Sequence, residues 1–238
     1  MKKRQITIKD IAKALHISPS TVSRSLADHP DISQETKNIV NAYAREHKYK
    51  PNALALSLRT NNTKTIGVIL PQIVHYFFSS VLSGIEDEAE KGGYRVIICQ
   101  SNENYEKEVK GAQALLEARV CGVLASVAKT TTIYNHFQEL IDSDIPMVFF
   151  DRICTGILTD RVVVDDYAGV CSAVEYLIRS GCRRIAFFGS PSHLAISNNR
   201  RMGYEDALRK NGLPVDKELI KICDNYTEAL RLTPELLS

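Results

Sequence analysis

Short runs of β-branched and apolar residues alternate with amphipathic segments along three quarters of the chain, from about residue 65 onward. The runs are Ile66–Leu70, Arg95–Cys99, Gly122–Val127, Pro146–Phe150, Arg161–Val164, Arg184–Phe188 and Leu219–Cys223. The segments between them, which have helical periodicity, are Phe77–Lys91, Tyr105–Arg119, Ile133–Ser143, Tyr167–Ser180 and Asn198–Asn211. Continuous apolar strands separated by helices are typical of parallel sheets that are covered on both faces. The sequence therefore predicts an α/β fold for this part.

Ligands of such sheets bind beyond the carboxyl ends of the strands, so the loops there are the place to look for a site. These loops carry no Gly-x-x-x-x-Gly-Lys phosphate loop and no Gly-x-Gly-x-x-Gly. Gly189-Ser190-Pro191-Ser192 follows a strand but lacks the closing glycine of a nucleophile elbow. Asp165-Asp166 has no accompanying metal or acid–base set, and capping of the strand end is the simpler interpretation. We expect no catalytic residue, no metal site and no cofactor.

The same loops do carry side chains that suit ligand binding. Phe77 and Phe78 follow the first strand, Asp151-Arg152 end the fourth, and Arg200-Arg201 follow the sixth. Aromatic rings stack on the apolar face of a sugar or base, and Asp and Arg hydrogen-bond its polar groups. The alternative is that both Phe rings belong to the helix–sheet core and that the charged groups are solvated.

Charge is distributed unevenly along a chain whose overall formal charge is only +2. Residues 1–60 hold eleven Lys and Arg against five Asp and Glu, a net of +6, whereas the other 178 residues have 19 basic and 23 acidic side chains, a net of −4. A basic head on an acidic body favours contact of the head with a polyanion. A solvated basic face without a partner remains the alternative on charge alone.

The head has the pattern of short helices joined by tight turns. Thr7 can cap a helix over 8–15, and Ser18-Pro19 starts a second helix with Ser as N-cap and Pro at the first helical position. This second helix is apolar only at Val22 and Leu26, so Pro19, Ser20, Thr21, Ser23 and Arg24 are predicted to point outward. A third helix is expected after Ser33, with an inner face of Ile39, Val40, Ala42 and Tyr43.

Two such helices fit a helix-turn-helix, whose second helix lies in the major groove of DNA. Short hydroxyl side chains allow close approach to the duplex, and Arg24 can reach a guanine with two donors. A three-helix bundle that contacts only protein has the same geometry, but the small polar face and the +6 charge favour DNA. After Tyr49, Ala53–Arg59 is a leucine-rich helical stretch too short to be stable alone, with Leu54 and Leu58 on one face.

The six cysteines are widely spaced and form no Cys-x-x-Cys pair, so we expect small buried apolar side chains. No apolar run approaches the roughly 18–20 residues that cross a bilayer. Thr7, Lys9 and Asp10 stand where a signal peptide would be apolar. We therefore expect a cytoplasmic protein without membrane contact, associated with the nucleoid through DNA.

The stretches TIKDIAKALHISPSTVSRSL (7–26), YKPNALALSLRT (49–60) and TIGVILPQI (65–73) resemble the lac repressor family of bacterial regulators in order and spacing. The resemblance implies a dimer on a pseudo-palindromic operator in double-stranded DNA. It implies a hinge helix over about 52–59, in which Leu58 wedges into the minor groove and Leu54 is its partner. The implied DNA-contacting residues are Thr7, Ser18, Pro19, Ser20, Thr21, Ser23, Arg24, Tyr49, Leu54 and Leu58. Leu56 stands where the family often has a polar or basic residue.

The same resemblance implies that residues 61–238 form a periplasmic-binding-protein-like effector domain, with a first lobe over about 64–166 and a partial second lobe over 167–238. Positions that match the family's pocket are Phe77, Phe78, Asp151, Asp165 and Arg200. Asp166 replaces a usual Asn and Cys182 a common His, so the ligand cannot be copied across. Because only two strands follow Asp166, we expect a C-terminally truncated regulator that exposes apolar surface in its second lobe.

The resulting prediction is a transcriptional regulator, most simply a repressor, whose operator affinity responds to a sugar or sugar derivative. Two other classes of protein fit the sequence less well. A pure ligand-binding protein does not explain the basic head, and a sugar-modifying enzyme with an accessory DNA module lacks a catalytic set.

Overall fold

The computed structural model describes residues 6–49, 63–223 and 225–237. The chain divides into two compact units, Met1–Asn61 and Asn62–Ser238. The predicted hinge helix over 52–59, with Leu54 and Leu58, lies outside the described residues. None of the described helices combines the length and the apolarity that a bilayer span requires.

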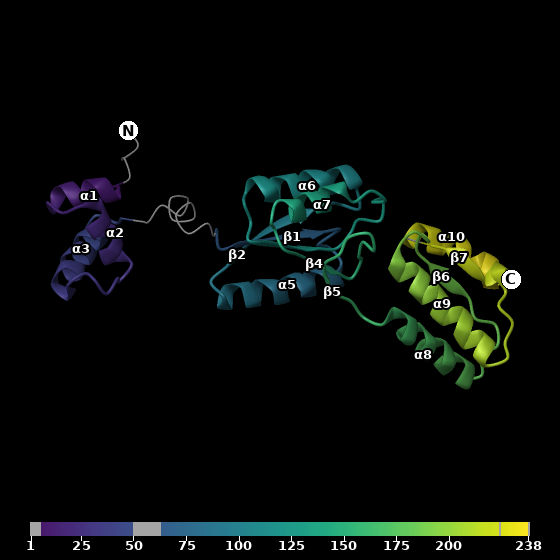
Figure 1. Cartoon of the computed structure of the whole chain (residues 1–238). Coiled ribbons are helices and arrows are strands. Elements are labelled where there is room, and N and C mark those ends of the chain that lie inside the picture. The colour runs from purple at the N-terminus through teal and green to yellow at the C-terminus, as the bar shows by residue number, and fades with distance from the viewer. Residues whose placement is uncertain (1–5, 50–62, 224, 238) are drawn as a thin grey trace. The chain divides into compact units, whose positions relative to one another are not determined.

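The described residues of the first unit, 6–49, form three short helices: α1 (Ile8–Ala14), α2 (Pro19–Leu26) and α3 (Gln34–Glu46), shown at the purple end of Figure 1. Each begins at a hydroxyl residue that accepts a backbone N–H: Thr7 from Asp10, Ser18 from Thr21 and Ser33 from Thr36. Such caps satisfy N–H groups that have no partner within the helix. Helices this short depend on packing as well, because isolated helices of fewer than about 12 residues are marginal in water.

The core of this unit joins all three helices. Its buried members are Ile11, Ala12, Val22, Val40 and Ala44. The predicted inner face of α3 is confirmed at Val40, which is buried, and at Tyr43, which packs against the core. It is wrong at Ile39, which is 51% exposed, and at Ala42, which is also exposed. Residues three to four apart share a helix face, and the face that turns inward is the one through Lys37, Val40 and Ala44. The aliphatic stem of Lys37 is buried on the face where the prediction placed Ile39.

The second unit opens with a five-stranded parallel sheet in the order β2-β1-β3-β4-β5. The strands are β1 (Thr65–Leu70), β2 (Arg95–Gln100), β3 (Gly122–Ala125), β4 (Met147–Phe150) and β5 (Asp160–Val162). All five were predicted, and their ends differ from the predicted ends by at most two residues. The expected α/β class with a parallel sheet is confirmed.

Helices cover both faces of this sheet (Figure 1). On one face α6 (Tyr105–Glu117) and α7 (Asn135–Asp142) pack on the sheet through a core that includes Ile69, Leu115 and Phe149. On the other face α5 (Tyr76–Lys91) packs through Phe78 and Leu82. All five carboxyl ends lie at one edge of the sheet, because the strands are parallel.

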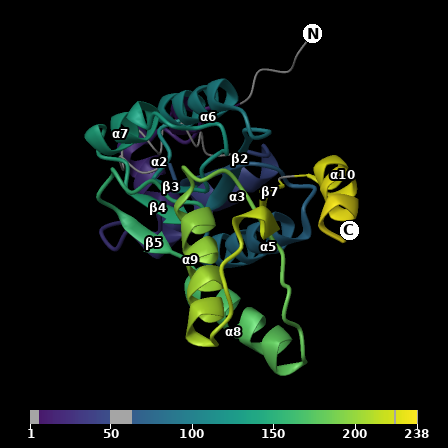
Figure 2. The same ribbon diagram turned by 90° about the vertical axis from the view of Figure 1, so that its right-hand side faces the viewer.

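The rest of the second unit is smaller. Strands β6 (Phe187–Gly189) and β7 (Ile220–Ile222) form a two-stranded parallel sheet. Helices α8 (Asp166–Arg179) and α9 (Ala195–Lys210) pack on one face through a core with Ile178, Tyr204 and Leu208. Helix α10 (Tyr226–Leu237) lies on the other side of β7, and the short 3-10 helix η1 (Lys217–Leu219) leads into that strand (Figure 2).

Two expectations for this part meet different outcomes. Large apolar side chains are exposed after Asp166 as expected: Tyr176 is 65%, Ile222 64% and Leu237 80% exposed. The cysteine expectation is largely wrong, because only Cys154 is buried and Cys182 is exposed. An apolar neighbour in the sequence does not determine burial, since alternate residues of a strand face opposite sides of the sheet.

Candidate functional site

The N-terminal end of α2 is a compact cluster of hydroxyl groups. Ser18 Oγ accepts the backbone N–H of Thr21 at 3.0 Å and lies 2.7 Å from Ser20 Oγ and 2.8 Å from Thr21 Oγ1. Pro19 occupies the first helical turn, where its missing N–H costs nothing. Pro19 and Ser20 are exposed, so this end of the helix presents small side chains to its surroundings.

The exposed face of α2 continues one turn further to Arg24. Arg24 is exposed, whereas Thr21 and Ser23 are half-buried, so the predicted outward face is narrower than the sequence suggested. The guanidinium group of Arg24 has five N–H donors in a fixed planar arrangement, which fits a pair of acceptors such as those on the edge of a guanine. A helix with small residues at its start and one long donor beyond them can lie close to a second surface and reach into it.

The inner face of α2 includes a residue that the sequence analysis missed. Val22 is fully buried, and Ser25 beside it is only 1% exposed. Ser25 Oγ donates to the carbonyl oxygen of Thr21 at 2.8 Å, which satisfies the buried hydroxyl within its own helix. Ser25 lies three residues after Val22, and this spacing places both on one face of the helix. The sequence analysis did not predict burial there because serine is polar.

Thr7 and Tyr49, the two predicted backbone-contacting residues, have structural roles in this unit. Thr7 and Asp10 form a reciprocal capping box at the start of α1: the Asp10 N–H donates to Thr7 Oγ1 at 3.3 Å, and the Thr7 N–H donates to Asp10 Oδ2 at 2.9 Å. Tyr49 is half-buried against the helical core, and burial raises the pKa of its phenol. Contact of either residue with DNA stays a prediction.

The two phenylalanines at the start of α5 differ sharply in exposure. Phe78 is 4% exposed and packs with Val68, Leu82 and Phe150 in the core beneath α5. Phe77 is 49% exposed, and its ring meets the Phe78 ring edge-on at 5.2 Å between centroids. The core alternative therefore describes Phe78, and only Phe77 offers a ring face for stacking on a ligand.

Asp151 stands at the carboxyl end of β4 in a left-handed conformation, with φ of 57°. Its side chain is 15% exposed, and Ser126, at the end of β3, donates to Asp151 Oδ2 at 3.4 Å. Neighbouring Arg152 does not point at free solvent: its Nη1 donates to both carboxylate oxygens of Glu103 at 2.8 Å, and its guanidinium carbon lies 5.8 Å from the Phe78 ring centroid.

Asp165 and Asp166 divide two tasks at the start of α8. Asp165 Oδ1 accepts the backbone N–H of Ala168 at 2.9 Å, so it caps the helix that follows, whereas the sequence indicated capping of the strand end. Asp166 Oδ1 instead accepts from Arg200 Nε of α9 at 2.7 Å. Arg200 is 45% exposed at its side chain and Asp166 11%. The predicted ligand residues Asp165 and Arg200 are thus both engaged by the fold.

Asp151, Asp166 and Arg200 lie close enough to influence one another electrostatically. Burial raises the pKa of Asp151, the Arg152 and Arg200 guanidinium groups and the Ser126 hydroxyl lower it, and the Asp166 carboxylate raises it. A further contact joins the same loops, because His193 Nε2 donates to the carbonyl oxygen of Lys129 at 2.6 Å. The arrangement can accept hydrogen bonds from a polar ligand at the carboxyl edge of the main sheet.

A buried polar network that the sequence analysis did not single out braces this edge. Glu108 of α6 is 0% exposed and accepts three hydrogen bonds: from the Ala128 N–H at 2.5 Å, Thr131 Oγ1 at 2.7 Å and His136 Nε2 at 3.0 Å. It fixes the loop after β3, which carries Ser126 at its start. A glutamate within an amphipathic helix gives no sign of burial in the sequence, because its partners come from distant segments.

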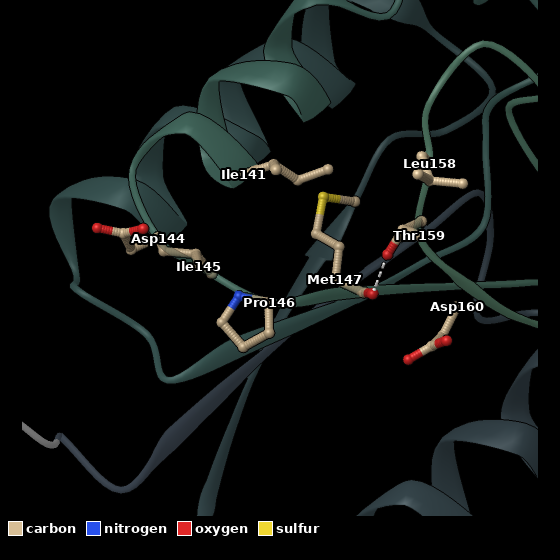
Figure 3. A pocket seen from close by; sticks show the side chains of 8 residues that line it. All are labelled: Ile141, Asp144, Ile145, Pro146, Met147, Leu158, Thr159 and Asp160. Carbon is tan, nitrogen blue, oxygen red and sulfur yellow. Dashed lines mark hydrogen bonds between the residues drawn. The ribbon is translucent and has the colours of Figure 1, made fainter.

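A surface hollow of about 520 Å³ lies elsewhere (Figure 3). Ile145 and Met147 line it at the amino end of β4, and Asp160 at the amino end of β5. Parallel sheets bind ligands at the opposite ends of their strands, so we assign no ligand to this hollow. No group of three or more His, Cys, Asp or Glu side chains in the described part of the chain is placed to hold a metal ion.

Comparisons with known proteins match both units. The family model "Bacterial regulatory proteins, lacI family" matches residues 7–52, and "Periplasmic binding proteins and sugar binding domain of LacI family" matches residues 63–237. The ribose operon repressor of Bacillus subtilis (strain 168) is 34% identical over 233 residues, which cover 98% of this chain and 69% of that protein.

Solved structures show the same architecture. The lac repressor dimer bound to operator and the anti-inducer ONPF superposes with a TM-score of 0.81 at 20% identity, over 98% of this chain and 70% of that one. A periplasmic binding protein/LacI transcriptional regulator from Alkaliphilus metalliredigens QYMF, complexed with D-xylulofuranose, has a TM-score of 0.59 at 29% identity, over 71% of this chain and 60% of that one. The chain thus spans 60–70% of the length of these three relatives.

Proposed function

The chain belongs to the lacI family of bacterial regulatory proteins, and from this premise we propose that it is a sequence-specific DNA-binding transcriptional regulator whose operator affinity responds to a small, sugar-like effector. The observation that carries the proposal is the capped helix α2, with exposed Pro19, Ser20 and Arg24 on a head of net charge +6. The relatives are named as regulators, so a role in transcription rather than in catalysis agrees with this site.

The head reads DNA through α2. Ser18, Ser20 and Pro19 approach the base edges closely, and Arg24 donates to a guanine in the major groove. Thr21 and Ser23 stand at the sides of this contact, where their half-buried hydroxyls face the backbone of the duplex. Thr7 and Tyr49 hold the phosphate backbone from the far ends of the head. Phosphate contacts fix the register of the head, and base contacts supply its sequence preference.

One short helix reads only a half-site, so specific binding needs two heads. We propose a homodimer on a pseudo-palindromic operator, because the two-fold symmetry of a helix-turn-helix dimer places its two heads on two symmetric half-sites. Leu58 completes the contact as an apolar wedge in the minor groove, with Leu54 as its partner in the hinge; both lie outside the described residues. Such wedges unstack a base step at a cost of a few kcal/mol, offset by contacts that the bent duplex permits. The protein would act in the cytoplasm, on the chromosome.

The second unit binds the effector at the carboxyl edge of the main sheet. Asp151 and Arg200 hydrogen-bond the polar groups of the ligand, the exposed Phe77 ring stacks on its apolar face, and Asp165 holds the start of α8 in place. Relatives named for the ribose operon or solved with D-xylulofuranose support a sugar as the ligand class. Effector and operator affinities are then coupled, and the coupling is reciprocal by thermodynamic necessity.

A selection of bound sequences from random duplex DNA tests this function directly. The proposal expects an enriched pseudo-palindrome, whose two half-sites are one helical turn or a multiple of it apart. Mobility shifts on that duplex should weaken steeply as salt rises, because phosphate contacts release counterions. Recovery of unrelated sequences with equal affinity would show that the head binds DNA only through its charge.

A further inference from the structure

The charged groups at the carboxyl edge of the main sheet include two arginines, and each already has a carboxylate partner. Arg152 Nη1 donates to both oxygens of Glu103 at 2.8 Å, with side chains that are 14% and 19% exposed. Arg200 Nε donates to Asp166 Oδ1 at 2.7 Å. An arginine whose charge is matched in this way attracts an added anion far less than a lone one does.

Asp151 has no such partner at close range. Its nearest guanidinium atom is Arg152 Nε, 3.9 Å from Oδ2, and that arginine is bonded more closely to Glu103. Three carboxylates (Glu103, Asp151 and Asp166) therefore face two guanidinium groups, which leaves one negative charge in excess. Asp165 and Lys129 lie on the same loops and have opposite charges, so they do not change this balance.

We propose, resting on the effector function above, that this site selects uncharged polyhydroxy compounds and rejects phosphorylated or carboxylated sugars, and that Asp166 sets this selectivity by pairing with Arg200. Hydroxyl groups donate to the carboxylates without adding charge. A phosphate would bring at least one negative charge to a partly buried group of acids, where water screens poorly. By pairing with Arg200, Asp166 thus lowers the affinity of the site for anionic ligands.

The environment of Asp151 supports this choice of ligand. Burial raises the pKa of this carboxyl although Arg152, Arg200 and the Ser126 hydroxyl lower it, and the Asp166 carboxylate adds a smaller rise. A second anion nearby would raise the energy of the ionised form again, whereas hydrogen bonds from hydroxyl groups stabilise it. The two classes of ligand therefore have opposite effects on Asp151.

The test compares D-ribose with D-ribose 5-phosphate, a pair that differs by the phosphate group, and adds inorganic phosphate as a third probe. Binding is measured by titration calorimetry on the full chain for wild type, Asp166→Asn and Asp166→Asn/Arg200→Gln. Asn keeps the size of Asp166 but releases the charge of Arg200. We expect ribose 5-phosphate and phosphate to bind the wild type too weakly to be measured with up to about 10 mM probe, the weak end of the range of affinities.

Asp166→Asn should bind both phosphate probes measurably, at least about tenfold more tightly than the limit set by the wild type, as expected for one unit charge several ångströms away. The double variant should lose that gain. Asp206→Asn is the matched control, because Asp206 pairs with Arg209 on α9 and its replacement removes the same charge. It should leave phosphate binding at the wild-type level.

Three results would overturn the proposal: binding of ribose 5-phosphate by wild type, no gain in Asp166→Asn, or an equal gain in Asp206→Asn. The last would show a general charge effect in place of a role for Asp166. None of these results bears on DNA recognition, which is measured by mobility shift without any sugar. Failure of the selectivity proposal and failure of the regulator function are therefore separate outcomes.

Discussion

An ideal Cβ on Gly203 would lie 2.5 Å from the carbonyl oxygen of Tyr167, so α9 and α8 meet at a distance that only glycine permits. Cys171 Sγ, one turn along α8, donates to the Gly203 carbonyl oxygen at 3.2 Å and marks the same close contact. This approach positions Asp166 at the start of α8 beside Arg200 on α9. The charge pair at the proposed effector site thus depends on a backbone contact one turn away.

Gly203→Ala should push the two helices apart and destabilise the second lobe by about 1–3 kcal/mol, the usual cost of overpacking. Hydrogen exchange of amides in α8 and α9 measures the effect locally. Gly169→Ala is the matched control on α8, where an added Cβ meets nothing within 4 Å. It should stabilise the helix by about 0.5–1 kcal/mol, because alanine restricts the unfolded chain more than glycine does. Equal protection in both variants would contradict the tight contact.

Glu108→Ala should cost about 3–5 kcal/mol of stability, because it leaves three donors from Ala128, Thr131 and His136 without their buried acceptor. Thermal unfolding followed by circular dichroism measures the loss. Glu117→Ala, an exposed position on the same helix, should change stability by no more than about 0.5 kcal/mol. A small effect at Glu108 would mean that water or a shifted loop replaces the carboxylate.

Asp151→Asn should raise the melting temperature at neutral pH and not at low pH. Burial raises the pKa of Asp151 in the folded state, so the folded protein binds this proton more tightly than the unfolded chain, whose value is about 3.9. The free energy of unfolding therefore falls as pH rises from the pKa of the unfolded chain to that of the folded state. Asn does not titrate and so avoids this loss. Asn also tolerates the left-handed backbone at this position.

The gain of Asp151→Asn over wild type should thus disappear near pH 4, close to the ordinary pKa of the carboxyl, and should grow as pH rises toward 8. A gain that is constant with pH would point to packing instead of ionisation. The same variant should lose sugar affinity if Asp151 accepts hydroxyl hydrogen bonds. A more stable protein with weaker binding is the combination expected of a functional carboxylate.

Leu58→Ala should weaken binding to the selected operator while leaving the melting temperature of the sugar-binding unit unchanged. The wedge proposal makes the leucine side chain part of the DNA contact, so the loss appears only in the presence of DNA. Fluorescence anisotropy with a labelled duplex measures it, and Leu54→Ala tests the partner position. Unchanged DNA affinity with a lowered melting temperature would place Leu58 in the body instead.

Local chemistry made the element order predictable. Ser18-Pro19 defines the start of α2 through a hydrogen bond between residues close in the chain. The β-branched runs define the strands, because apolar strands that alternate with helices usually form a parallel sheet. These inferences need only contacts between residues that are close in the sequence.

What failed depends on which side of an element turns inward. Ile39 is exposed on α3 while Lys37 is buried through its stem and pairs with Asp28 at 2.8 Å. Phe78 joined the core and Phe77 did not, although both follow the same strand. The partners that decide these outcomes, such as Phe150 beneath Phe78, come from segments far away in the sequence. The pair Arg200–Asp166 was likewise invisible, because 34 residues separate its members.

The central claim is that α2 reads bases, and Arg24→Ala tests it most directly. The measurement is the ratio of affinities for the selected operator and for a scrambled duplex of equal length, by fluorescence anisotropy at one fixed salt concentration. Arg45→Ala, which removes the same charge from an exposed position on α3, is the matched control. The account predicts that Arg24→Ala costs about 1–3 kcal/mol on the operator, loses its preference at one base position of each half-site and leaves the scrambled duplex almost unchanged, whereas Arg45→Ala keeps the ratio. An equal loss on both duplexes in Arg24→Ala would show that Arg24 contacts phosphate, and base reading by α2 would be contradicted.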